Sequence, residues 1–122
     1  MSKINKFSGN QSGFSWEDVQ IREYAAEFSG VTKQVPIGEN ENSSNFIIRY
    51  FCLQPGTHSN LEKHPHEHGV IVMHGRARLQ LNDTFTEVAP FDAIFISGGD
   101  LHQFVQIGDE PFGFLCVIKP KG

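Results

Sequence analysis

The sequence predicts an all-β domain, built as a sandwich or a barrel, and two observations carry that prediction. From residue 46 onward, short runs of β-branched and aromatic residues are separated by turn residues every 8–12 positions, the spacing of a sandwich or barrel. In Ala77–Leu81 apolar and polar side chains alternate, as they do in a half-buried strand. The length of 122 residues fits a single domain over 1–122.

The N-terminal part of the chain gives the weakest signal. Its first residues are polar, and we expect 1–15 to be flexible. Residues 16–35 are ambiguous between helix and strand, although Val31 and Val35 favour short strands. Gly, Asn, Ser and Glu dominate Ile37–Asn45, so we expect a loop there.

Strand signals become strong at Phe46–Leu53, a continuous apolar run that Pro55 and Gly56 end as a turn. Asn82 and Asp83 mark a hairpin turn further along the chain. Six more strands are expected, at Val70–Met73, Ala77–Leu81, Phe85–Val88, Ala93–Ile96, His102–Ile107 and Phe112–Ile118.

Composition and charge exclude several classes of protein. Lys and Arg number 10 against 14 Asp and Glu, a net charge of −4, so a basic nucleic-acid-binding surface is not expected. No apolar stretch reaches the roughly 18 residues of a membrane span, and Met1–Asn10 lacks the apolar core of a signal peptide. Two cysteines, Cys52 and Cys116, do not make a disulfide scaffold. We therefore expect a soluble, cytoplasmic protein with no nucleic-acid or membrane partner.

Histidines gather in one part of the sequence. Five of the six lie within 58–74, where random placement would put about one. Imidazole is the commonest transition-metal ligand, and a carboxylate is a good companion. Glu62, His64, His66 and His68 share parity, but a straight strand would spread the first and last about 20 Å apart.

The chain must therefore turn within this segment, and Pro65 is a reason for it to do so. Glu62 and His64 then lie on one strand and His68 on the return strand, which leaves His66 at the tip. A fourth ligand has to come from elsewhere, and His102, which opens a strand after a glycine turn, is suitably placed. We expect these residues to bind a metal ion: Glu62, His64, His68 and His102.

These residues resemble the cupin superfamily, small β-barrels built around two motifs. Gly56, five residues, then Glu62-Lys63-His64 match the first motif, and His102 with the preceding Ser97–Gly99 turn matches the second. The phrase His64–His68, read His-Pro-His-Glu-His, is similar to a subgroup of small bacterial and archaeal cupins that bind manganese or iron and have dioxygenase-like activity. The resemblance covers about 30–119.

The resemblance implies a single jelly-roll-like cupin barrel, a double-stranded β-helix, with one divalent transition metal per chain. The sequence departs from the family motifs at several positions: Glu62 stands for a His, Gly69 for a Glu, Phe91 for a Gly, Ser97 for a Pro and Gln106 for an Asn. Because Glu62 lowers the formal charge of the site from +2 to +1, a harder or more easily oxidised metal is favoured. We expect Mn or Fe, with Co, Ni or Zn as alternatives.

Further residues are candidates for the pocket or for contacts with the ligands. We assign this role to His66, Glu67, Phe104, Phe114 and Cys116. Arg49, in an otherwise apolar strand, either faces outward or contacts an anion in the pocket, and we favour the outward orientation. The remaining His58 and His74 are expected to be surface or packing residues.

The predicted function is that of a mononuclear non-haem metal oxygenase, using dioxygen and a small, apolar or aromatic substrate. Two alternatives stay open: a non-catalytic metal- or ligand-binding module such as a sensor, and a lyase, isomerase or decarboxylase that uses the metal as a Lewis acid. Oxygen consumption by the metal-loaded protein separates the oxygenase from both alternatives. A homodimer is also expected, since a partner's N-terminal strand often caps the edge of such a barrel.

Overall fold

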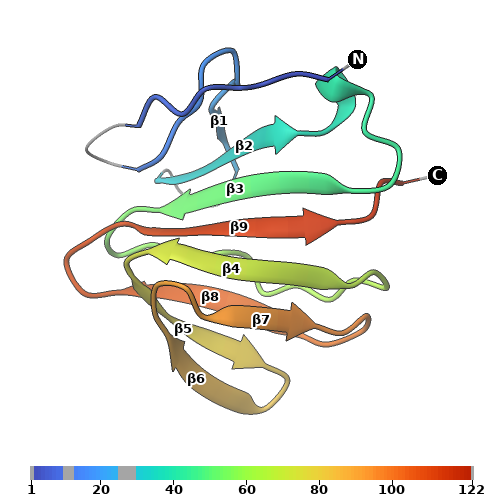
Figure 1. Cartoon of the computed structure of the whole chain (residues 1–122). Coiled ribbons are helices and arrows are strands. Elements are labelled where there is room, and N and C mark those ends of the chain that lie inside the picture. Colours follow the sequence, from blue (N-terminus) through green and yellow to red (C-terminus); the bar gives the residue numbers. More distant parts are fainter. Residues whose placement is uncertain (1, 10–12, 25–29, 122) are drawn as a thin grey trace.

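The computed structural model describes residues 2–9, 13–24 and 30–121 and has nine strands and one short helix in those ranges (Figure 1). The strands are β1 (Arg22–Glu23), β2 (Val31–Ile37), β3 (Ile47–Leu53), β4 (His68–His74), β5 (Arg76–Leu81), β6 (Thr84–Val88), β7 (Ala93–Ile96), β8 (His102–Ile107) and β9 (Phe112–Ile118). The single-turn 3-10 helix is Glu39–Glu41, inside the predicted loop. Among the described residues, no helix has the length and apolar character that crossing a membrane requires.

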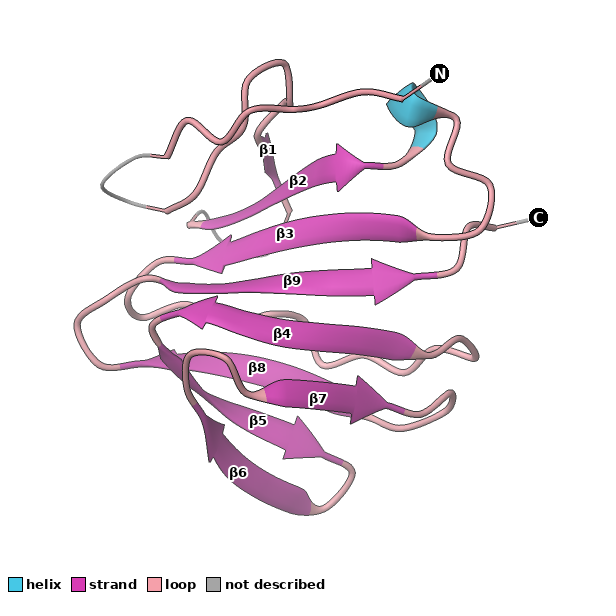
Figure 2. Cartoon of the chain, in the orientation of Figure 1, coloured by secondary structure: helices cyan, strands magenta, loops and turns pink. Residues whose placement is uncertain are grey.

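Two antiparallel sheets make up the fold. The larger has the order β1-β2-β3-β9-β4-β7 and the smaller the order β6-β5-β8. In Figure 2, strands and loops make up the described part of the chain apart from the one short helix. The all-β prediction is confirmed, and the ambiguous segment 16–35 contains strands β1 and β2, with residues 25–29 lying outside the described part.

The last three strands agree with the predicted boundaries, whereas β4 is longer than predicted at both ends. It begins at His68, two residues before the expected start, because its pairing with β7 and β9 extends to His68 and Gly69. Pairing with neighbouring strands thus extends β4 beyond the apolar run from which the sequence predicts it.

The core lies between the sheets, on the inward faces of strands whose side chains alternate. The inward side chains of β9 are those of Phe112, Phe114 and Cys116. They lie beside the inward side chains of the neighbouring β3, where Phe51 pairs with Phe114. Aromatic rings supply much of this core, with Phe104 and Phe114 stacked at 4.5 Å between ring centroids. The abundant phenylalanine of the sequence is explained in part by this layer.

A second aromatic cluster covers the opposite, outer face of the larger sheet. Here the N-terminal segment crosses the sheet, and the ring of Phe14 stacks on Tyr50 at 5.6 Å. The Phe14 N–H donates to the Tyr50 hydroxyl oxygen (2.9 Å), and the Phe14 carbonyl accepts from Gln34 Nε2 (2.8 Å). His74 completes the cluster, with its ring 4.8 Å from that of Phe14.

Two departures from the cupin motifs have structural consequences here. Phe91 stands in place of a glycine and has a φ of 73°, the left-handed region in which a glycine meets no steric penalty. Gln106 is buried, and its amide fastens a loop: Oε1 accepts from the Gly56 N–H, and Nε2 donates to the carbonyls of Gly108 and Glu110. Gln106 therefore acts in the scaffold.

Candidate metal centre

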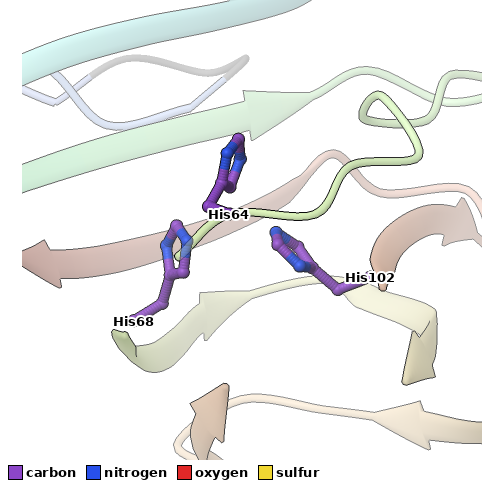
Figure 3. A group of neighbouring side chains, drawn as sticks. All are labelled: His64, His68 and His102. Atoms are coloured by element: carbon purple, nitrogen blue, oxygen red, sulfur yellow. The ribbon is translucent and has the colours of Figure 1, made fainter. Parts of the chain in front are cut away.

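Three histidines meet at one end of the barrel. His68 opens β4, His102 opens β8, and His64 comes from the loop between β3 and β4 (Figure 3). One nitrogen of each ring lies within 4.8 Å of the corresponding atoms of the other two. These three histidines are positioned to bind a metal ion.

The loop that carries Glu62 and His64 differs from the strand that we predicted. Glu62 makes a single isolated bridge to His102, with two backbone hydrogen bonds of 3.0 and 2.8 Å, and no regular strand runs through it. The His64 carbonyl accepts from the Gly99 N–H, and Gly98 lies so close to Pro65 that an added Cβ would be 2.2 Å from the Pro65 carbonyl oxygen. The glycine turn therefore holds the histidine loop in place.

In two of these histidines the hydrogen bonds leave ring nitrogen Nε2 available to a ligand. His102 Nδ1 lies 2.9 Å from the Asp100 carbonyl oxygen, which can only accept, so Nδ1 carries the proton and Nε2 holds a lone pair. His68 Nδ1 lies 3.3 Å from Cys116 Sγ, while its Nε2 is buried without a hydrogen-bond partner. An orphaned buried nitrogen is unfavourable unless a ligand satisfies it, so His68 fits a metal ligand.

The electrostatics of the site favour neutral imidazoles. Burial first, and then the neighbouring positive groups, led by His102 and Arg49, together lower the pKa of His68 to about 3. Burial, followed by repulsion from His64, also lowers the pKa of His66. A neutral ring is the form that binds a metal.

Glu62 has two contacts in the site. Its Oε2 lies 3.3 Å from His64 Nε2, close enough for both atoms to lie about 2.1 Å from a shared ion. Its negative charge also acts on Tyr24: burial, then the nearby Glu62 carboxylate, raises the pKa of that phenol. Glu62 and Tyr24 thus line the pocket together with the histidines, and Tyr24 stays protonated.

The histidines open into a pocket of about 830 Å³ that runs between the sheets. Of the other predicted site residues, His66, Phe104, Phe114 and Cys116 line this pocket, and the His66 ring stacks on His64 at 4.9 Å. Glu67 is exposed and is not among the lining residues. The pocket therefore has histidines at one end and phenylalanines along its wall.

The two histidines that we set aside lie elsewhere. His58 Nδ1 contacts the Ser59 carbonyl (2.8 Å) and the Gln103 amide (3.2 Å). His74 belongs to the outer cluster, with Nδ1 on the Pro111 carbonyl (2.8 Å) and Nε2 on the Tyr50 hydroxyl. Neither is in the three-histidine group.

The prediction that Arg49 faces outward is wrong. Alternation along β3 places Arg49 on the same inward face as Phe51, and it lines the pocket. The sequence around Arg49 did not indicate this orientation, because its neighbours are apolar and a strand that is buried on both faces shows no alternation. Sequence reasoning also missed Lys33 and Tyr24, which line the same pocket from an N-terminal region without a clear pattern.

Comparisons with known proteins agree with this architecture. The family model of the cupin domain, Cupin_2, matches residues 49–118. A protein of Rhodospirillum rubrum named 1-methylthio-D-xylulose 5-phosphate methylsulfurylase is 38% identical over 115 residues, covering 91% of this chain and 72% of the relative.

Solved structures give the same result. A cupin-2 domain from Rhodospirillum rubrum has a TM-score of 0.82 at 37% identity, covering 94% of this chain and 78% of the other. The polyketide cyclase RemF of Streptomyces resistomycificus has a TM-score of 0.78 at 26% identity, covering 99% of this chain and 80% of the cyclase. Similar barrels thus support different reactions.

Proposed function

The chain belongs to the Cupin_2 family of cupin domains, and from that premise we propose that it is a metal-dependent enzyme acting on a small organic molecule. His64, His68 and His102 would hold one divalent transition-metal ion, with Glu62 as the fourth ligand. The observation that carries this proposal is the buried, unpartnered Nε2 of His68, a residue that has one ring nitrogen within 4.8 Å of nitrogens of His64 and His102.

The donor set fits such an ion. Three imidazoles and one carboxylate suit Mn or Fe, with Co, Ni or Zn as alternatives. When bound, the metal would supply a Lewis acid that polarises an oxygen atom of the substrate.

The protein's own groups have separate tasks. The Tyr24 hydroxyl, whose pKa is raised by burial and by the nearby Glu62, keeps its proton and can present it to a developing oxyanion. Phe104 and Phe114 form an apolar wall that excludes water from the bound molecule. Cys116, within 3.3 Å of His68 Nδ1, helps to orient that imidazole.

For the reaction class we propose Lewis-acid chemistry on an oxygen-bearing substrate, the lyase or isomerase alternative in the sequence prediction. The relative from Rhodospirillum rubrum is named for an activity on a methylthio sugar phosphate, and it supports this choice at 38% identity. The Tyr24–Glu62 pair gives the site a group that can move a proton, which such chemistry needs.

An oxygenase with dioxygen as co-substrate is the second candidate. The phenylalanine wall favours it, because that wall suits an apolar or aromatic substrate.

One experiment separates the two candidates. Metal-loaded protein would be incubated with sugar phosphates, including 1-methylthio-D-xylulose 5-phosphate, and with aromatic compounds, while oxygen uptake and substrate loss are followed.

Substrate loss without oxygen uptake supports the Lewis-acid assignment, and uptake coupled to substrate loss overturns it in favour of the oxygenase. Tyr24→Phe should lower kcat with little change in metal content. If the metal-loaded protein binds compounds but turns none over, a binding or sensing module is the better description.

We also propose a cytoplasmic homodimer. Apolar side chains on the outer face of the larger sheet support the dimer: Phe95 is 62% exposed and Val117 is 40% exposed, and both pair with Gly69 in the strand between them. Light scattering should give about twice the chain mass, and Phe95→Lys should shift it toward the monomer. A wild-type mass of 13.7 kDa would contradict the dimer.

A further inference from the structure

We propose that Arg49 and Lys33 form an anion subsite in the pocket, which binds the phosphate group of a phosphorylated substrate while the rest of that substrate reaches the histidines. The role in turnover rests on the proposed function. The subsite itself rests on the charges and contacts of β2 and β3.

Arg49 and Lys33 point into the same cavity from neighbouring strands. Lys33 is paired with Phe51 in the β2–β3 register, and Arg49 lies two residues from Phe51 on the same face. The guanidinium lies over the Phe51 ring, 5.0 Å from its centroid, and the Lys33 ammonium lies 5.7 Å from the centroid of Tyr24. Aromatic surfaces therefore hold both cations at the pocket wall.

Arg49 also reaches the metal centre. Its Nη2 lies 3.2 Å from Cys116 Sγ and 3.5 Å from His68 Nδ1. A group bound by Arg49 would therefore be a neighbour of the histidine cluster within one cavity.

Neither Arg49 nor Lys33 forms an ion pair with a carboxylate in the described part of the chain. The ion pairs found there join Lys3 with Glu41 and Arg76 with Glu87, and the Glu62 carboxylate lies beside His64. Arg49 Nε is buried and has no hydrogen-bond partner. A guanidinium in a pocket normally has a carboxylate or phosphate partner, so this arrangement is typical of a site that a ligand completes.

The two cations also repel each other. Burial lowers the pKa of Lys33, and the positive charge of Arg49 lowers it further. Bound anionic charge between them would relieve that repulsion, and a dianion would relieve it more than a monoanion. Arginine presents a planar fork of donors that matches a phosphate, and lysine adds a point charge. We therefore assign a phosphate monoester rather than a carboxylate.

Arg78 offers a matched control. It lies on the exposed face of β5 with its guanidinium 5.4 Å from the Phe85 ring centroid, so it makes the same kind of cation–π contact away from the pocket. The test measures binding of inorganic phosphate and of acetate by calorimetry to the full chain, both metal-loaded and after metal removal. Wild type would be compared with Arg49→Gln, Arg49→Lys, Lys33→Gln and Arg78→Gln.

We expect Arg49→Gln to weaken phosphate binding about tenfold or more in both forms of the protein, Lys33→Gln to weaken it less, and Arg78→Gln to leave it unchanged. Arg49→Lys should retain part of the affinity. Circular dichroism of each variant checks folding, and Lys33→Gln provides a second test of the subsite if Arg49→Gln does not fold.

Several results would overturn the subsite. These are equal phosphate affinities for wild type, Arg49→Gln and Lys33→Gln, an equal loss in Arg78→Gln, acetate binding as tightly as phosphate, and phosphate binding to the metal-loaded form alone. Metal content measured in parallel separates the two proposals. Phosphate binding through Arg49 in a protein that takes up no metal would contradict the proposed metal centre and leave the subsite standing.

Discussion

The two ends of β4 carry histidines in opposite situations. His68, at the start of the strand, has a buried nitrogen without a partner and faces the pocket. His74, at the other end, has both nitrogens hydrogen-bonded, to the Tyr50 hydroxyl and to the Pro111 carbonyl. The comparison shows that unsatisfied polar atoms distinguish a binding histidine from a packing histidine on the same strand.

A change of register separates these two environments. The two histidines are six positions apart, so an unbroken strand would point both to one face. The pairing of β4 with β9 shifts between Val72 and His74, which puts His74 opposite Gly113 on the outer face. One extra residue in the ladder thus directs two identical side chains to different sides of the sheet.

The largest expected difference between the two histidines is in metal binding. His68→Ala removes a ligand of the proposed centre, so metal content should fall from about one equivalent per chain to near zero. His74→Ala should keep the full metal content, because His74 is outside the three-histidine group. Elemental analysis of both variants checks this. Equal metal contents in the two variants would contradict the claim that His68 binds the metal and His74 does not.

The next effect concerns stability at the outer cluster. The His74 ring occupies the space above Gly113, where an added Cβ would lie 2.1 Å from His74 Nε2. Gly113→Ala should therefore destabilise the fold by about 2–3 kcal/mol. Adding His74→Ala should remove most of that penalty, as a double-mutant cycle by denaturant unfolding would measure. Additive losses would show that the ring and Gly113 are independent.

Tyr50→Phe should have a smaller effect. It leaves the Phe14 N–H and His74 Nε2 without the hydroxyl that bonds them, at a cost of about 1–2 kcal/mol. Metal content should not change. A loss of metal in this variant, measured by elemental analysis, would mean that the two ends of β4 are coupled and would weaken the distinction between them.

The smallest effect is predicted on the pocket side. Cys116→Ala removes the sulfur beside His68 Nδ1 and should weaken metal affinity about tenfold, with the stoichiometry unchanged. Competition with a metal-binding dye measures this. Unchanged affinity would mean that the Cys116 thiol does not help to orient the imidazole.

Much of this molecule follows from sequence patterns. Local alternation and turn residues predict the strands from β5 to β9, and the turn at Pro65 predicts that His64 and His68 converge. These are short-range signals: a turn or a period of two. His102 is distant in the sequence, and its place in the site is predicted from the glycine turn before it and from the resemblance to the second cupin motif.

The parts that could not be predicted depend on contacts between distant strands. Arg49 faces the pocket because of the β3–β9 register, and Tyr24 and Glu62 line the same pocket although they are far apart in the sequence. The shift that turns His74 outward is a property of the β4–β9 ladder. None of these features can be recognised from the local pattern of residues.

The most direct test of the central claim is elemental analysis of the wild-type chain purified without a metal-affinity tag. The three-histidine centre predicts about one equivalent of a divalent transition metal per chain, as isolated or after reloading. No metal uptake after reloading with manganese, iron, cobalt, nickel or zinc would contradict it, and the unpartnered nitrogen of His68 would then need another ligand.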